Sequence, residues 1–254
     1  MIKISAPKNH PRYLSLFYRD LLTWGVKEGI TSLTGLTAHG RGETFDYLIG
    51  EKTQRFAVKA IEAAAALFLL SKHPVISVNG NTAILAGKEL IKLTNLLGGN
   101  LEVNIFHASK ERERKIKAYL IKCGAQKVLL PHKARIPGIE SNRRMISSEG
   151  QLKSDVVFVP LEDGDRTAAL EKMGKKVITV DLNPLSRTAQ TATITIVDNI
   201  VRALPLLIEK IKTYQKYQKN QLKKILHTYD NQAILSSSLK FIGERLTYLS
   251  SHKR

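Results

Sequence analysis

The sequence lacks the features that mark secreted, membrane-spanning or cysteine-zinc proteins. Cys123 is the only cysteine in 254 residues, which excludes an internal disulfide or a cysteine-based zinc cluster and agrees with a reducing compartment. The longest apolar run, residues 63–70, is far shorter than the roughly 20 residues that a transmembrane helix needs. Residues 1–13 carry charge and proline but no apolar segment like that of a secretory signal. We therefore expect a cytoplasmic protein that does not span a membrane.

Common nucleotide-binding motifs are also missing. A dinucleotide fingerprint that starts at Gly40 would need a glycine where Phe45 stands, and a P-loop lysine at position 88 would need Ser or Thr where Glu89 stands. If the protein binds ATP, it does so by other means. A zinc site is not expected either, because the candidate histidines lack metal-ligand spacing: His39, His107 and His132.

Acidic residues are scarce relative to basic ones, and the formal net charge is +18. Such a charge favours either nucleic acid or small phosphorylated substrates as partners. Residues 201–254 hold eleven Lys and Arg against three Asp and Glu, so nearly half of the excess lies in this tail. Its irregular apolar spacing favours a solvated helix face, and aromatic residues, at 6%, are too few for base-stacking surfaces. Nucleic acid is therefore the less favoured partner.

From residue 74 onward, short β-branched runs alternate with helix-like segments, which is typical of a parallel sheet covered by helices. The predicted strands span residues 74–80, 101–106, 127–131, 155–160, 176–181 and 192–198. Most are continuous apolar runs, as buried parallel strands are. Helices are predicted over residues 87–97, 110–122 and 166–173, and an aspartate of Asp163-Gly164-Asp165 can cap the last of them.

Two further helices are predicted ahead of the sheet, over residues 12–28 and 52–71, with a glycine-rich loop between them. The resulting fold class is α/β: a doubly wound, mainly parallel sheet with a helical N-terminal segment. We predict that residues 1–213 form a single domain and that residues 214–254 add a basic helical C-terminal extension to the same unit.

Polar residues follow most of the predicted strands. In open α/β sheets, ligands bind outside the carboxyl ends of the strands, where these residues lie. Any one of them alone would be interpreted as a turn or a helix cap. Because several strand ends behave alike, a shared ligand site is favoured; it includes Asn79-Gly80-Asn81, Asn104, His107, residues 162–167, Asp181-Leu182-Asn183 and Asp198-Asn199.

Two glycine- or proline-containing segments suit anion binding. In residues 35–43, Gly40 and Gly42 flank Arg41, so backbone N–H groups and a guanidinium could face one phosphate. A tight interhelical turn would explain these glycines equally well. In residues 183–192, hydroxyls and Arg187 follow Pro184 between two strands, which suits phosphate or ribose. A loop whose polar side chains satisfy their own backbone is the alternative there.

Taken together, these segments resemble the archaeal-type phosphopantothenate synthetases, the 4-phosphopantoate:β-alanine ligases. The matching stretches, which include Arg19 beside the first, are HPRYLSL (10–16), GLTAHGRGETFDYLIGE (35–51), PVISVNGN (74–81), EVNIFH (102–107), VPLEDGDRTAAL (159–170) and VDLNPLSRTAQTATITIVDN (180–199). The departures are Thr37, where an aliphatic residue is expected, Gln190, where a basic one is expected, and the lysine-rich tail.

The resemblance implies a homodimer with a Rossmann-like fold that joins 4-phosphopantoate to β-alanine in coenzyme A biosynthesis. ATP would be converted to AMP and diphosphate through an acyl-adenylate, with Mg²⁺ and fixed cations stabilising the phosphoryl oxygens. By the same resemblance, the ATP-binding residues are Arg19, Arg41, Asp181, Leu182, Asn183, Arg187, Thr188, Asn199 and Ile200.

Further roles follow from residue chemistry. We expect His39 and the substrate-binding residues Asn79, Gly80 and Asn81 near 4-phosphopantoate, with His39 and Arg41 in catalytic roles. Asp163 and Asp165 are candidate catalytic residues near magnesium or the attacking amine, and helix capping is an equal alternative for both. The metal ligands stay open. A dehydrogenase or methyltransferase is the rival enzyme class, and the missing glycine fingerprints disfavour it.

Overall fold

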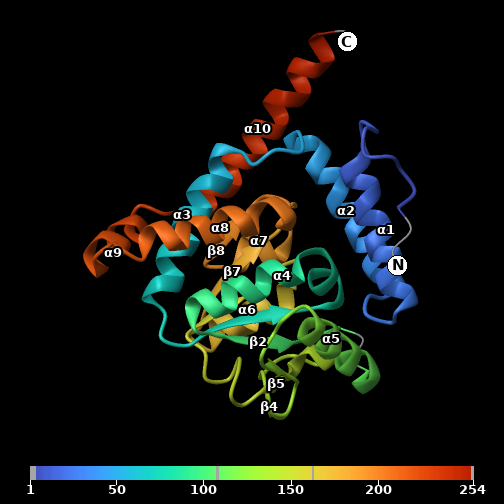
Figure 1. Ribbon diagram of the computed structural model, residues 1–254. Helices are drawn as coiled ribbons and strands as arrows, with labels where there is room; N and C mark the ends of the chain where they lie inside the picture. Colours follow the sequence, from blue (N-terminus) through green and yellow to red (C-terminus); the bar gives the residue numbers. More distant parts are fainter. Residues whose placement is uncertain (1–3, 107–108, 162, 253–254) are drawn as a thin grey trace.

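The protein is described by a computed structural model that covers residues 4–106, 109–161 and 163–252. Its centre is a six-stranded, all-parallel sheet in the order β3-β2-β1-β6-β7-β8 (Figure 1). The strands are β1 (Pro74–Val78), β2 (Asn100–Val103), β3 (Val128–Leu129), β6 (Val156–Phe158), β7 (Lys176–Val180) and β8 (Ile194–Ile196). Each lies within one of the six predicted ranges or one residue beyond it. The order reverses between β1 and β6, as in a Rossmann sheet, so the predicted fold class is confirmed.

Helices from both halves of the chain cover one face of the sheet. This face carries the large apolar core, in which α3 (Arg55–Leu70), α4 (Gly80–Leu97), α5 (Lys110–Lys122) and α8 (Ile200–Tyr214) pack. The opposite face is covered by α6 (Gly164–Lys172) and by an antiparallel pair, β4 (Lys133–Arg135) and β5 (Met145–Ser147). The strand pattern does not predict this short hairpin, because its strands are only three residues long and β4 has a single apolar residue between two exposed basic ones.

The alternation of side chains along the strands separates two kinds of interior. On β6, Phe158 points into the large apolar core, whereas Val157 belongs to the smaller cluster on the other face. That second face also buries polar residues in cross-strand pairs: Ser77 opposite Glu102, and Thr179 opposite Thr195. We call these two sides the apolar face and the polar face.

The glycine-rich segment predicted as a loop is instead part of a helix, α2 (Leu33–Ile49). Ser32 caps its start by accepting a hydrogen bond from the backbone N–H of Gly35 at 3.2 Å, and Gly50 ends it in the left-handed conformation. Each interior glycine costs a helix about 1 kcal/mol relative to alanine. At Gly35 the missing side chain is needed, since an added Cβ would lie 2.5 Å from the Asn81 Oδ1 atom.

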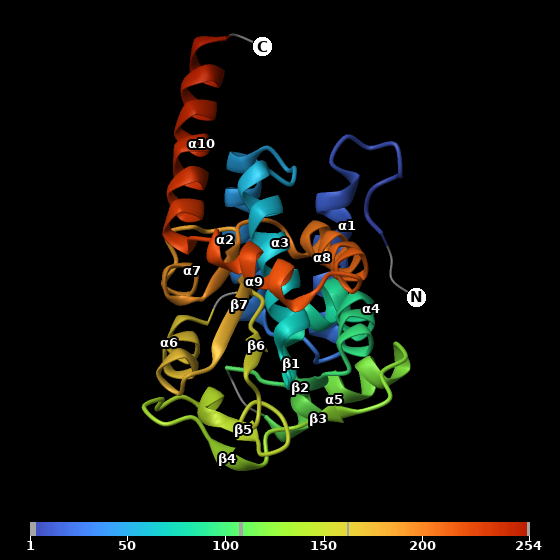
Figure 2. The ribbon, with the colours of Figure 1, turned by 90° about the vertical axis from the view of Figure 1, so that its left-hand side faces the viewer.

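The remaining helices lie at the two ends of the chain or are short connections between strands. α1 (Tyr13–Lys27) precedes α2, η1 (Asn142–Arg144) precedes β5, and α7 (Arg187–Thr191) precedes β8. The C-terminal segment forms α9 (Lys219–His227) and α10 (Asn231–Ser251), and the end of α10 extends away from the body of the molecule in both views (Figures 1 and 2). Among the described residues, no helix is long and apolar enough to cross a membrane.

Candidate active site

A cavity of 420 Å³ lies at the carboxyl edge of the sheet, between the strand ends and α2. The switch point between β1 and β6 is at its floor, which is where α/β sheets of this order bind ligands. Its walls are formed by Ile30, Ser32, Thr34, Gly35, Ala38, His39, Arg41, Gly42, Glu43, Phe45, Asn79, Gly80, Asn81, Leu85, Ile105, Phe106, Arg112, Arg143, Leu161, Asp181, Leu182, Asn183, Asn199 and Ile200.

The helix α2 forms one wall and is tied to the sheet at its start. Asn81, in the first turn of α4, donates from Nδ2 to the Gly35 carbonyl at 2.8 Å. Asn79 caps α4 by accepting from the Thr82 N–H, and a Cβ on Gly80 would lie 2.2 Å from the Ile30 carbonyl oxygen. The predicted substrate residues 79–81 therefore line the cavity and also hold the start of α2 against the sheet.

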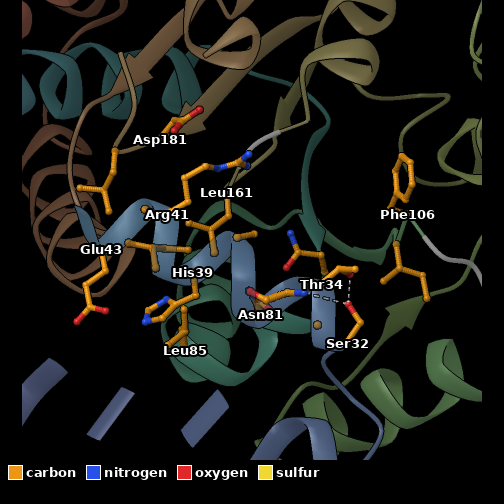
Figure 3. Close-up of a pocket in the computed structure, with 18 of the residues that line it drawn as sticks. Ser32, Thr34, His39, Arg41, Glu43, Asn81, Leu85, Phe106, Leu161 and Asp181 are labelled. Atoms are coloured by element: carbon orange, nitrogen blue, oxygen red, sulfur yellow. Dashed lines mark hydrogen bonds between the residues drawn. The ribbon is translucent and has the colours of Figure 1, made fainter. Parts of the chain in front are cut away.

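The end of α2 is tied down by a second polar cluster. Asp46 accepts from Asn199 Nδ2 at 2.8 Å and from Arg202 at 2.5 and 3.1 Å. Arg202 also pairs with Asp198, which follows β8, and Asn199 caps α8. Both attachments fix the intervening turns, in which His39 and Arg41 line the cavity; Figure 3 shows them on opposite sides of α2, with Arg41 directed toward Asp181 and His39 toward Leu85.

His39 occupies the middle of this wall. Burial lowers its pKa, and the positive charge of Arg19 acts in the same direction, although the carboxylates of Glu43 and Asp46 oppose the shift. The imidazole is therefore neutral at physiological pH. A neutral imidazole facing a cavity can accept a proton from a reacting group.

The loop after β7 forms the opposite wall. Asp181 is buried and accepts hydrogen bonds from the Ser186 hydroxyl and, at 2.9 Å, from the Asn183 N–H. Nearby, Leu161 adopts a left-handed backbone (φ 61°), a conformation that leucine rarely takes and that is found at binding sites. Figure 3 shows Asp181 and Arg41 on one side of the cavity and Phe106 on the other.

The far side, near Phe106, is built on the polar face of the sheet. Arg143 places its guanidinium carbon 5.6 Å from the centre of the Phe106 ring and forms an ion pair with Asp163. Asp163 also pairs with Arg166 at 2.6 Å, and Arg166 donates to Ser77 Oγ on β1 at 2.7 Å. The cavity thus has a cationic group at this end that is held from behind.

Comparisons with known proteins show the family to which the chain belongs. The sequence profile of the family described as Phosphopantothenate/pantothenate synthetase matches residues 56–245. The chain is 52% identical over 250 residues to a 4-phosphopantoate--beta-alanine ligase of Thermococcus kodakarensis, covering 97% of this chain and 95% of that protein. The chain belongs to this family. Relatives with the same name from Thermococcus onnurineus (50% identity; 98% of this chain, 96% of that protein) and Methanosarcina mazei (47%; 96% and 97%) cover equally much.

The structure brings most of the predicted site residues of this synthetase family member to one cavity. Those that line it are His39, Arg41, Asn79, Gly80, Asn81, Asp181, Leu182, Asn183, Asn199 and Ile200. They come from α2 and from the ends of β1, β7 and β8, which are far apart in the sequence. His107 and Glu162, expected at the same edge, lie outside the described residues.

The other predicted residues do not line the cavity. Arg19 donates to Glu43, a lining residue, at 2.8 and 3.0 Å. Arg187 is exposed and pairs with Asp165 at 2.5 Å. Thr188 is buried and accepts a hydrogen bond from the Asp163 N–H at 2.7 Å. Arg19 and Arg187 are thus engaged with carboxylates outside the cavity lining or at its rim.

The surroundings of Asp163 and Asp165 do not favour the predicted magnesium role. Asp163 lies between two guanidinium groups, which already balance its charge and would repel a divalent cation. It occupies the N-cap position of α6, yet its side chain makes no capping hydrogen bond. Across residues 4–106, 109–161 and 163–252, no cluster of three or more His, Cys, Asp or Glu residues could hold a metal ion.

Several lining residues are not predicted from the sequence: Ser32, Thr34, Arg112 and Arg143. Arg143 lies in a stretch without strand or helix periodicity, so nothing nearby marks it. The available signal was Asn104, a fully buried amide after β2, which donates to the carbonyls of Arg143 and Met145, both at 3.1 Å.

Proposed function

We propose that this protein joins 4-phosphopantoate to β-alanine at the expense of ATP, giving 4′-phosphopantothenate, AMP and diphosphate for coenzyme A biosynthesis. The observation that carries the proposal is the cavity at the switch point, which His39 and Arg41 of α2 line together with the Asp181 loop and the Asn79–Asn81 turn. Near 50% identity to 4-phosphopantoate--beta-alanine ligases over almost the whole chain supports the same reaction.

The first step activates the carboxylate of 4-phosphopantoate. One carboxylate oxygen attacks the α-phosphorus of ATP, the bond from that phosphorus to the bridging oxygen breaks, and diphosphate leaves. Negative charge grows on the phosphoryl oxygens, so Arg41 is placed to stabilise the transition state. Arg19 and Arg187, which now pair with carboxylates, would supply further positive charge after a rotamer change. Asp181, Leu182, Asn183, Asn199 and Ile200 would hold the nucleoside.

The second step forms the amide. The β-alanine amine attacks the acyl carbon, the bond to the AMP oxygen breaks, and the amine loses a proton. We assign that proton to His39, because burial keeps its imidazole neutral and therefore able to accept it. A positioned base of this kind typically contributes about 10²–10⁴-fold to a rate.

Magnesium would enter with ATP. Mg²⁺ in nucleotide sites is held largely by substrate phosphates and water, with one or two carboxylates. The absence of a metal-ligand cluster among the described residues is compatible with that arrangement, in which the ion supplies additional charge stabilisation.

Product analysis tests the proposal. Purified protein should release AMP and 4′-phosphopantothenate when ATP, Mg²⁺, 4-phosphopantoate and β-alanine are all present, and no ADP. Leaving out 4-phosphopantoate should abolish AMP release. Formation of ADP instead of AMP would exclude an acyl-adenylate, and retention on duplex DNA with steep salt dependence and no turnover would support nucleic-acid binding.

The assembly and the cellular location are proposed on the family resemblance. A homodimer in the cytoplasm agrees with a metabolic ligase whose single cysteine stays reduced. Light scattering coupled to gel filtration should give twice the 28.4 kDa chain mass, and a mass of one chain would contradict the dimer.

A further inference from the structure

The cavity has two chemically different ends, set by the order of the strands. Asp181 and Asn199 follow β7 and β8, whereas Phe106 and Arg143 lie beyond the end of β2. Three strands separate β2 from β8 in the sheet. With neighbouring strands about 4.8 Å apart, the loops after β2 and β8 are roughly 19 Å from each other, and the Arg143 guanidinium lies between them, because its partner Asp163 follows β6. That length accommodates a nucleotide and a small acid placed end to end.

The arginine at the β2 end is fixed in position from two directions. Asn104 holds the backbone of residues 143 and 145, and Asp163 holds the Arg143 guanidinium. Asp163 is in turn held by the buried Arg166, which donates to Ser77 of the central strand. Such a chain of contacts restricts a side chain that would otherwise adopt many rotamers.

Among the described residues, the Asp163 carboxylate is shared between the guanidinium groups of Arg143 and Arg166, so it balances only part of their positive charge. Arg112, from the first turn of α5, lines the same cavity. Glu102 lies deeper on the polar face, and its carboxylate accepts hydrogen bonds from three N–H groups of Ser147 and Gln151. The buried Nε–H of Arg143 has no hydrogen-bond partner among the described residues.

The chemistry of the proposed reaction determines which end of 4-phosphopantoate lies near Phe106 and Arg143. Its carboxylate must reach the α-phosphorus of ATP, which places the carboxylate toward the nucleotide end. The phosphate at the opposite end of the same molecule then points toward Phe106. Guanidinium groups bind phosphate through paired, charge-assisted hydrogen bonds, and the Ser32 and Thr34 hydroxyls add neutral donors nearby.

We propose that Arg143, positioned by Asp163, binds the phosphate of 4-phosphopantoate and makes the enzyme select the phosphorylated acid over pantoate. This inference rests on the proposed ligase function. It assigns Asp163 to positioning a substrate-binding group and replaces the magnesium or amine role predicted for that residue.

The test compares two acids that differ only in the phosphate. AMP release gives kcat/KM for 4-phosphopantoate and for pantoate with saturating ATP and β-alanine, in wild type, Arg143→Met and Arg143→Lys. A hydrogen bond to a charged group contributes about 1.5–3 kcal/mol, so Arg143→Met should lower kcat/KM for 4-phosphopantoate about 10- to 150-fold. The value for pantoate should change less than about threefold, and lysine should restore part of the preference. If pantoate reacts too slowly, its inhibition constant against 4-phosphopantoate replaces its kcat/KM.

The ratio of kcat/KM for 4-phosphopantoate to kcat/KM for pantoate is measured in one preparation, so partial misfolding does not alter it. The matched control is Arg135→Ala, which removes an exposed arginine of β4 and should leave the ratio unchanged. Asp163→Asn should reduce the ratio in the same direction as Arg143→Met, by a smaller factor. An equal fall for both acids would assign Arg143 a structural role, and a rise in the KM for β-alanine or ATP would place it on another substrate. Absence of AMP formation by wild type would overturn the ligase function itself.

Discussion

The two faces of the central sheet are both buried, but with different chemistry. On the apolar face, Phe158 and its neighbours pack against α3, α4 and α8. On the polar face, Ser77, Glu102, Thr179 and Thr195 are almost inaccessible and are satisfied by hydrogen bonds or ion pairs. Hydrophobic burial stabilises a fold without specifying a unique arrangement, whereas buried polar groups require defined partners. The difference indicates that the apolar face carries most of the stability, whereas the polar face holds the Arg143 end of the site.

The largest effect is expected on the apolar face. Phe158 is fully buried and packs edge-on to Phe68 at 6.0 Å between ring centres, so Phe158→Ala should lower the free energy of unfolding by about 3–5 kcal/mol. Chemical denaturation measures this change. The KM values of the fraction that stays folded should not change, and Val58→Ala on the exposed side of α3 is the control. If Phe158→Ala changed KM and left the free energy of unfolding unchanged, the apolar face would act on the site and not on stability.

A variant of Arg41 tests the cavity at the carboxyl edge of the sheet. Arg41→Ala should lower kcat for AMP formation about 10²–10³-fold, because one preorganised group that stabilises transition-state charge is lost. The thermal unfolding midpoint should stay within about 2 °C of wild type, since the side chain lies outside the core. Near-normal turnover would remove Arg41 from the proposed ATP site.

His39 should set the acid limb of the rate profile. Burial lowers its pKa, so the neutral imidazole persists below pH 6.5 and activity should fall only as the pH drops through that lowered value. His39→Gln should reduce the amide-forming step about 100-fold and remove this limb. The measurement is kcat/KM for β-alanine from pH 5 to 8. An unchanged limb in the variant would assign it to another group.

Glu102 tests the polar face through pH-dependent stability. Burial raises its pKa above the unfolded value of about 4.3, although hydrogen bonds from Ser147 and Gln151 oppose the shift. Its contribution to stability is therefore complete below the unfolded pKa and is lost as the pH rises through the folded pKa. The unfolding free energy of wild type minus that of Glu102→Gln should decrease from pH 4 to 8. A difference that increases with pH would mean that the hydrogen bonds outweigh burial.

The smallest effect is expected far from both faces. Lys216, Lys219, Lys223 and Lys224 are exposed, so replacing all four with Gln should change turnover less than about twofold. A severe loss of activity would show that the C-terminal segment serves the dimer or the active site. Measuring the mass of the variant by light scattering separates these two outcomes.

Periodicity predicted the parallel strands well because buried strands need continuous apolar runs. The hairpin β4–β5 is not predicted because three-residue strands are too short to show an apolar run, although Ala134 and Ile146 are buried. The glycines of residues 35–43 predict a loop, but tertiary contacts hold this segment in the helix α2. The contact of Gly35 with Asn81 and the cap at Ser32 offset the weak helix propensity.

The site could be predicted where strand ends supply it, since parallel strands bring their carboxyl ends together. Asn79, Asp181 and Asn199 were found in this way. Arg143 could not be, because its position depends on an ion pair with Asp163 and an amide contact from Asn104 across the fold. Long-range electrostatic contacts leave no spacing in the sequence.

Because α2 is attached at both ends, substitutions at the attachment residues should affect catalysis even where they do not contact a substrate. One attachment, at Gly35, depends on Asn81, and the other, at Asp46, depends on Arg202. His39 and Arg41 lie between them on a single rigid element. Damage to either attachment displaces the base and the cation together, so both half-reactions should slow in parallel. Such a pattern distinguishes a misaligned helix from the loss of one chemical group.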